Sequence, residues 1–334
     1  MKILVYGAGV MGCQLVHRLC KRKRNEVTLL ARGEWKNAID KEGLVIRHSG
    51  YFHTTKDKVR TIDKLEKMDE YDLIFVVMRY NQVFNVLRNL GENISSNIIL
   101  IGNNLDPKLC EQEINKWSKV KKNIAFGLFD GAGYRDKNVI VSISRVFTKI
   151  TIGGVRKRIS NDFKNIIELT FKRTGYKPIF EEDMEAWLLS HVAQMLPGCY
   201  LCYTYNLDIE KVTKKDAAMA VVATVEAHRL LKSLGYPICP EGKEEAYEED
   251  IERHAKKVHF RYTRMIGKFF ISNFCKHIID EMNYIDIAFN EFREKSSVEM
   301  NVWDELRERA RRQIAVQENS RLALQFDCNF ATLK

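Results

Sequence analysis

Residues 1–12 decide the fold of this chain and read Met1-Lys2-Ile3-Leu4-Val5-Tyr6-Gly7-Ala8-Gly9-Val10-Met11-Gly12. The apolar run at 2–6 is typical of a parallel strand that is buried on both faces. Residues 13–21 continue at the spacing of an amphipathic helix. Between strand and helix, Gly7 permits a tight turn, Gly9 lets the backbone approach a pyrophosphate, and Gly12 lets the two elements pack closely. This context predicts a dinucleotide site, and a glycine turn without a ligand is the alternative.

Two places along the chain indicate which dinucleotide is bound. The pyrophosphate is expected at the N–H groups of the turn formed by Gly7, Ala8, Gly9, Val10, Met11 and Gly12. The second predicted strand, at 26–31, ends where an NAD enzyme usually carries an acidic residue, and this chain has Arg32 there. An arginine suits a 2′-phosphate through bidentate pairing, so NADP is the predicted cofactor. Glu34 could serve the ribose instead, and an exposed loop arginine is the other interpretation of Arg32.

Length and composition bound the class of protein. A chain of 334 residues with 45% hydrophobic content is long enough for two packed domains. No apolar run has the length of a membrane span, and the N-terminal strand does not resemble a signal peptide. Eight cysteines without clustered spacing are typical of reduced thiols, so a cytoplasmic protein without a metal is expected. The close pair Cys199 and Cys202 lies in an apolar helical stretch, which favours core packing.

The net charge of +10 is concentrated in the first half of the chain. Residues 1–178 hold 33 Lys and Arg against 18 Asp and Glu, whereas residues 179–334 hold 21 against 26. Positive charge beside the glycine turn fits a polyanionic cofactor. Basic clusters at 21–24 and 307–312 would also fit nucleic acid, but neither is interleaved with aromatic residues or part of a nucleic-acid motif. We therefore expect no nucleic-acid partner.

The first half of the chain alternates strands and helices, which predicts a Rossmann domain over residues 1–180. Buried parallel strands are expected at 72–78 and 97–102, with helices at 81–90, 108–117 and 161–173. Two strands at 43–48 and 51–60 are predicted to form a hairpin inserted into the main sheet. Three further strands, at 123–129, 139–143 and 149–152, predict an antiparallel meander that closes the sheet, and 177–180 is a last extended piece.

Residues 181–334 show no strand pattern. Apolar residues at helical spacing predict helices at 183–203, 214–234, 241–257, 260–274, 277–295 and 301–319. The whole chain is thus predicted to be an α/β protein, with an N-terminal Rossmann dinucleotide-binding domain and an all-helical C-terminal domain. The long apolar helices could also supply a homodimer interface.

Polar residues follow the expected parallel strands at their carboxyl ends, where open α/β sheets bind ligands. Arg79 follows the strand at 72–78 and could meet a phosphate, a ribose or a carboxylate substrate. Asn103 follows the strand at 97–102 and can both donate and accept hydrogen bonds. These residues should converge with the glycine turn. Asparagine is also common in turns, so a purely structural role for Asn103 stays open.

Several motifs in order resemble the ketopantoate reductase (2-dehydropantoate 2-reductase) family. They are Gly-Ala-Gly-x-x-Gly at 7–12, Leu-Leu-Ala-Arg-Gly at 29–33, Phe-Val-Val-Met-Arg-Tyr-Asn-Gln at 75–82, Ile-Gly-Asn-Asn at 101–104, Arg-Asp-Lys-Asn-Val-Ile at 135–140 and Met-Glu-Ala-Trp at 184–187. The resemblance implies NADPH and hydride transfer to a small 2-oxo acid in a cleft between two domains. It also implies that Arg32 holds the 2′-phosphate and that Asn103 contacts cofactor and substrate, with Arg79 where the family usually has a lysine.

The chain departs from the family at the residues that carry the chemistry. The family's general acid is a lysine two residues after Trp187, and this chain has Leu189 there; the asparagine one turn later is Ala193. The resemblance leaves Asp280 and Glu281 near the family's acidic substrate-binding position, without a clean match. A leucine cannot donate the proton that the developing alkoxide needs.

His191 is the predicted substitute for the missing proton donor, because an imidazole titrates near neutrality. It lies two residues from position 189, about 200° around an ideal helix, so a histidine packed in the core is an equal alternative. Weaker candidates for the donor are Tyr200, Tyr203 and His277.

Three functions follow from these residues. The first is an NADP-dependent oxidoreductase that acts on a small 2-oxo acid, or on a related carbonyl or imine. The second is a non-catalytic sensor that binds NADP(H), and the third is a true 2-dehydropantoate 2-reductase with an altered proton donor. We expect the first.

Overall fold

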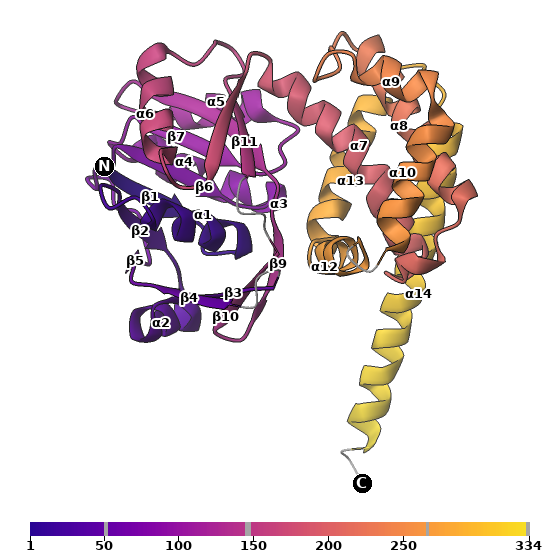
Figure 1. Cartoon of the computed structure of the whole chain (residues 1–334), viewed down its shortest axis with the longest axis horizontal. Coiled ribbons are helices and arrows are strands. Elements are labelled where there is room, and N and C mark those ends of the chain that lie inside the picture. Colours follow the sequence, from indigo (N-terminus) through magenta and orange to yellow (C-terminus); the bar gives the residue numbers. More distant parts are fainter. Residues whose placement is uncertain (50–52, 144–147, 265–266, 332–334) are drawn as a thin grey trace. The chain divides into compact units, whose positions relative to one another are not determined.

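The computed structural model describes residues 1–49, 53–143, 148–264 and 267–331 (Figure 1). The chain divides into two compact units, Met1–Leu188 and Leu189–Lys334, and the division falls within helix α7 (Met184–Thr204). The first unit combines strands and helices. No strand occurs in the described part of the second unit, so the predicted α/β class with a helical C-terminal half is confirmed.

The first unit is built on an eight-stranded sheet of order β12-β11-β8-β7-β6-β1-β2-β5. All neighbouring pairs are parallel except β8 and β11. The strands are β1 (Lys2–Tyr6), β2 (Glu26–Leu30), β5 (Arg60–Ile62), β6 (Leu73–Val77), β7 (Asn97–Ile101), β8 (Asn123–Phe129), β11 (Thr148–Gly153) and β12 (Tyr176–Glu181). β1 lies between β2 and β6, with Ile3 opposite both Val27 and Leu73. The glycine turn therefore leaves an interior strand of the sheet.

A second sheet of four strands was not predicted, and it corrects two expectations. Its order is β4-β3-β10-β9, with β3 (Leu44–His48), β4 (His53–Asp57), β9 (Ala132–Asp136) and β10 (Val139–Ile143). The hairpin expected in the main sheet, whose residues 50–52 lie outside the described part, belongs to this sheet instead. The meander is also wrong, because β10 pairs with β3 and β9 while β8 and β11 stay in the main sheet. Neighbouring strands along a chain need not share a sheet.

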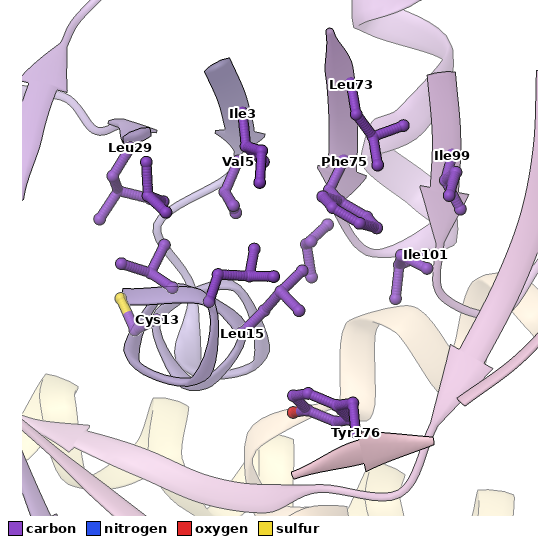
Figure 2. Packing of buried hydrophobic residues seen from close by; sticks show 14 of the residues in the cluster. Ile3, Val5, Cys13, Leu15, Leu29, Leu73, Phe75, Ile99, Ile101 and Tyr176 are labelled. Carbon is purple, nitrogen blue, oxygen red and sulfur yellow. The ribbon is translucent and has the colours of Figure 1, made fainter. Parts of the chain in front are cut away.

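The core of the first unit lies between the main sheet and its helices. α1 (Val10–Cys20) packs its Leu15 and Cys13 beneath Val5 and Phe75 of the sheet (Figure 2). The other helices of this unit are α2 (Gly33–Glu42), α3 (Tyr80–Val83), α4 (Leu87–Glu92), α5 (Pro107–Lys116) and α6 (Asn161–Phe171), with a 3₁₀ turn at Phe84–Val86. The single helix expected at 81–90 is thus three short pieces. Burying each large aliphatic side chain here contributes about 1.5–3 kcal/mol.

The second unit continues from α7 with α8 (Lys214–Ser233), α9 (Lys243–Glu249), α10 (Ile251–Thr263), α12 (Asn273–His277), α13 (Ile279–Arg293) and α14 (Asn301–Ala331). A 3₁₀ turn at Ile209–Lys211 and a π-helical turn at Lys268–Ser272 complete it. The charged helix expected at 241–257 is divided at Asp250, whose carboxylate accepts from the N–H of Arg253 and so begins α10. No helix in the described part of the chain is long and apolar enough to cross a membrane.

Candidate functional site

The glycine turn is held by two positions at which only glycine fits. Gly7 has φ +123°, and a Cβ there would lie 2.2 Å from the carbonyl oxygen of Val77. A Cβ on Gly12 would lie 1.9 Å from the carbonyl oxygen of Gly7 itself. The turn thus closes against the end of β6 on one side and against the first turn of α1 on the other. Both contacts are with backbone atoms, which cannot rotate away as a side chain can.

Gly9 is different, because a Cβ there would meet nothing within 4 Å. Its carbonyl accepts from the N–H of Cys13 at 2.9 Å, so it caps α1. The N–H groups of Val10, Met11 and Gly12 in the first turn have no acceptor within the helix, as at every helix N-terminus. Open space beside unpaired donors and the positive end of the helix dipole fits a pyrophosphate. The residues present therefore fit a dinucleotide.

Arg79 and Asn103 lie at the same edge of the sheet as the glycine turn. They follow the carboxyl ends of β6 and β7, which are the next two strands after β1 in the sheet. Gly102, with φ +145°, would place a Cβ 2.5 Å from the carbonyl oxygen of Met78, so the two strand ends are in close contact. The structure thus brings Gly7, Arg79 and Asn103 together at one edge. Asn104 has a structural role, since its Oδ1 accepts from the N–H of Asp106 at 2.8 Å.

Arg32 stands immediately before α2, as its N-cap residue, and is exposed. Its Nε donates to the carbonyl oxygen of Asp63 at 3.3 Å, and its Nη2 donates to the hydroxyl of Tyr6 at 3.5 Å. Burial raises the pKa of Tyr6 although the guanidinium opposes this, so the phenol stays neutral. Glu34 lies exposed in the first turn of α2. The arginine is oriented from two sides, and the rest of its guanidinium can meet an anion at the start of α2.

Trp35 connects the start of α2 to the glycine turn, and the sequence pattern did not indicate this. Its indole N–H donates to the carbonyl oxygen of Ala8 at 2.9 Å, and the thiol of Cys13 donates to the same oxygen at 3.5 Å. The Trp35 side chain is buried, and the Arg135 guanidinium lies 5.4 Å from its ring centroid. Two donors on one carbonyl fix the orientation of the Ala8 peptide at the centre of the turn. A tryptophan three residues after Arg32 carries no sequence signal for such a contact.

Replacing Trp35 with phenylalanine keeps an aromatic ring but removes the donor to Ala8. We expect NADPH binding to weaken about two- to tenfold, the value of one neutral hydrogen bond. Binding can be measured by fluorescence titration of NADPH. Trp117→Phe is the matched control, because Trp117 lies at the end of α5 against Arg88, outside the turn. Equal NADPH affinity of the Trp35→Phe and wild-type proteins would contradict the positioning role of Trp35.

In the second unit, the positions of the family's lysine and asparagine are apolar and buried. Leu189 and Ala193 are both fully buried on α7. His191 lies on α7 as well, where packing of its ring and, second, the charge of Lys243 lower its pKa to about 4. The imidazole is therefore neutral at pH 7 in the free protein. A neutral imidazole is a weak acid, so the low pKa counts against the predicted role of His191 as the proton donor.

The weaker candidates are engaged elsewhere or exposed. The hydroxyl of Tyr200 donates to Asp286 at 2.5 Å, and that of Tyr203 donates to the carbonyl oxygen of Cys275 at 3.0 Å. His277 is exposed at the end of α12. The predicted substrate residues separate in the first turn of α13, where Asp280 is exposed and Glu281 is buried. Burial raises the pKa of both tyrosines, which keeps their protons on.

Three cysteines of the second unit, Cys199, Cys202 and Cys275, lie in the core. Cys199 and Cys202 are buried on α7, and the Cys199 sulfur lies 4.0 Å from that of Cys275. Their environment is that of packed thiols, as expected from the apolar helical stretch. Within the described ranges, no three His, Cys, Asp or Glu side chains are placed to hold a metal ion.

The first unit also matches a family model over residues 3–156, described as ketopantoate reductase PanE/ApbA. Over these residues the N-terminal unit is similar to that family. The match confirms the resemblance of the motifs that lie within residues 3–156. The family name denotes an oxidoreductase. A comparison with curated protein sequences finds no significant match.

Solved structures extend the likeness to the helical half of the chain, as a likeness of fold. D-mandelate dehydrogenase with NADH and anilino(oxo)acetate has a TM-score of 0.72 at 18% identity, over 94% of this chain and 98% of that chain. The probable 2-dehydropantoate 2-reductase of Bacillus subtilis has a TM-score of 0.69 at 16% identity, over 94% and 100%. A ketopantoate reductase of Staphylococcus aureus, described as dimeric, has a TM-score of 0.65 at 10% identity, over 96% and 99%.

Proposed function

We propose that this chain is an NADP-dependent oxidoreductase that reduces a small 2-oxo acid, or a related carbonyl or imine. The observation that carries the proposal is the glycine turn, closed at Gly7 and Gly12 and open at Gly9. Open space beside the free N–H groups of α1 is what a pyrophosphate requires. NADPH, when bound, supplies a hydride to the substrate carbon. The family of the first domain supports a reductase.

NADP is proposed over NAD because of Arg32. A 2′-phosphate adds two negative charges that a ribose hydroxyl lacks, and the start of α2 offers a guanidinium together with helix N–H groups. The contacts with Asp63 and Tyr6 keep Arg32 at this place before any cofactor arrives. Glu34 in the first turn is the residue that would favour NAD if Arg32 turned away.

The proposed roles of the remaining site residues follow from their chemistry. Asn103 and Arg79 lie at the sheet edge that holds the glycine turn, where an amide can contact the substrate oxygen and a guanidinium can contact a phosphate or a carboxylate. His191 is proposed to donate the proton to that oxygen, and Asp280 and Glu281 to contact the substrate. The ligand of the structurally similar D-mandelate dehydrogenase, anilino(oxo)acetate, supports a substrate that carries both an oxo group and a carboxylate.

A sensor that binds NADP(H) without turnover is the second candidate, and two observations favour it. The position of the family's lysine is a fully buried leucine, and His191 has a pKa of about 4. A histidine of that pKa is almost entirely neutral at pH 7, and the remaining N–H of a neutral imidazole is a weak acid. A true 2-dehydropantoate 2-reductase with an altered donor remains the third candidate.

The deciding experiment follows NADPH oxidation with a panel of 2-oxo acids that includes ketopantoate. We expect turnover by the wild-type protein, and a loss of about 100-fold or more in kcat for His191→Ala with an unchanged Kd for NADPH. His259→Ala on α10 is the matched control. NADPH binding without turnover of any acid would favour the sensor. Turnover that survives in His191→Ala would remove His191 from the mechanism, and turnover restricted to ketopantoate would favour the third candidate.

A further inference from the structure

The second unit contains a group of polar side chains of which the proposed reaction uses only His191. They come from three neighbouring helices: His191 and Gln194 from α7, His228 from α8, and Lys243 and Tyr247 from α9. The side-chain amide of Gln194 donates to the hydroxyl of Tyr247, which joins α7 to α9. The ring of Tyr247 meets that of His228 edge-on, with centroids 5.9 Å apart, which joins α9 to α8.

The positions along each helix place the rest of the group on the same faces. His191 lies one turn before Gln194 on α7, and Lys243 lies one turn before Tyr247 on α9. The charge of Lys243 is one of the causes that lower the pKa of each imidazole. The ammonium group and the two imidazoles thus lie in one neighbourhood.

Two members of the group are unsatisfied. His228 is fully buried, and neither of its ring nitrogens has a hydrogen-bond partner in the described part of the molecule. Buried polar groups in proteins are almost always paired, so an imidazole with two free nitrogens needs a reason. Burial also lowers the pKa of His228 to about 4, so the ring is neutral and carries one N–H donor.

Lys243 is the second unsatisfied member. It is partly buried, burial lowers its pKa, and its ammonium makes no ion pair with a described residue. Two carboxylates of the same helix are engaged elsewhere, since Glu244 pairs with Lys232 at 2.9 Å and Glu248 pairs with Arg229 at 2.9 Å. A partly desolvated cation without a counter-ion is costly, and an anion beside it would offset that cost.

We propose that Lys243, His228 and His191 form a binding site for a small carboxylate anion at the face of α9 that meets α7 and α8. One positive charge and neutral N–H donors match a monoanion with two acceptor oxygens. A cation is disfavoured by Lys243, and within the described ranges no metal-binding group of three side chains occurs. The site shares His191 with the proposed reaction, but its occupancy can be tested without the cofactor and without turnover.

The test is the effect of acetate on thermal unfolding of the full chain, with chloride replacing acetate at constant ionic strength. Acetate is expected to raise the melting temperature of the wild type in a saturable way, because a ligand that binds only the folded state stabilises it. In Lys243→Gln the acetate affinity should fall at least about tenfold, the value of a charge-assisted contact. Lys256→Gln is the matched control, because Lys256 is exposed and pairs with Glu252 on its own helix at 2.7 Å.

Three results would overturn the proposal. They are no saturable effect of acetate on the wild type, an equal effect in Lys243→Gln, and phosphate binding more tightly than acetate with the same dependence on Lys243. The last would assign the site to a different anion.

A measurement on the wild type alone covers the case in which Lys243→Gln does not fold. Reductive methylation followed by peptide mass spectrometry reports how fast each lysine reacts. Acetate should slow the methylation of Lys243 and leave that of Lys256 unchanged. Methylation of Lys243 at the same rate with and without acetate would contradict the site.

Discussion

Replacing Gly12 with alanine is expected to abolish NADPH binding and to destabilise the first unit. The added Cβ would lie 1.9 Å from the carbonyl oxygen of Gly7 and 3.1 Å from its carbonyl carbon. Only a backbone shift can relieve that overlap, and the shift would open the turn between β1 and α1. We expect a loss of about 1–3 kcal/mol in the free energy of unfolding, the usual cost of overpacking. Urea unfolding and NADPH titration measure the two effects.

Gly9→Ala is the matched variant, because a Cβ there meets nothing within 4 Å and the φ of −74° suits any residue. Its stability should equal that of the wild type. Its NADPH affinity should still fall at least about tenfold, because the methyl group occupies the space that a pyrophosphate needs. Wild-type NADPH affinity in Gly9→Ala would show that the cofactor does not approach the turn. Wild-type stability in Gly12→Ala would contradict the packing described for α1.

Replacing Arg32 with glutamine is expected to reduce the preference for NADPH over NADH. The affinity for NADPH should fall about 10- to 100-fold, because charge-assisted pairing with the 2′-phosphate is worth about 1.5–3 kcal/mol. The affinity for NADH, which lacks that phosphate, should stay the same. Parallel titrations of the wild type and the variant with both cofactors give the four dissociation constants.

Arg88→Gln is the control for a loss of positive charge from the same unit, since Arg88 pairs with Glu92 on α4 at 3.1 Å. Both cofactors should bind it as they bind the wild type. An equal loss of NADPH and NADH affinity in Arg32→Gln would mean that Arg32 acts by supporting Tyr6 and Asp63. If the affinities for both cofactors stay the same, Arg32 is an exposed loop residue without a role in cofactor binding. Glu34 would then be the candidate for the contact with the ribose.

The strand–turn–helix at residues 2–20, the parallel strands at 73–77 and 97–101 and the helical second half could all be predicted from the sequence. Each depends on local information, namely the spacing of apolar residues and the glycines that a tight turn demands. The positions of Arg79 and Asn103 followed as well, because the carboxyl ends of neighbouring parallel strands meet at one edge.

Which strands pair, and which distant side chains meet, was decided only by the tertiary structure. β3 pairs with β10, which lies far along the chain, and no local pattern specifies such a partner. The contacts of Trp35 with Ala8 and of Tyr247 with His228 likewise join separate elements. Sequence spacing determines which face of its own element a side chain occupies. The element that this face meets depends on how the whole core packs, so the anchor of the glycine turn and the environment of His191 became visible only in the folded chain.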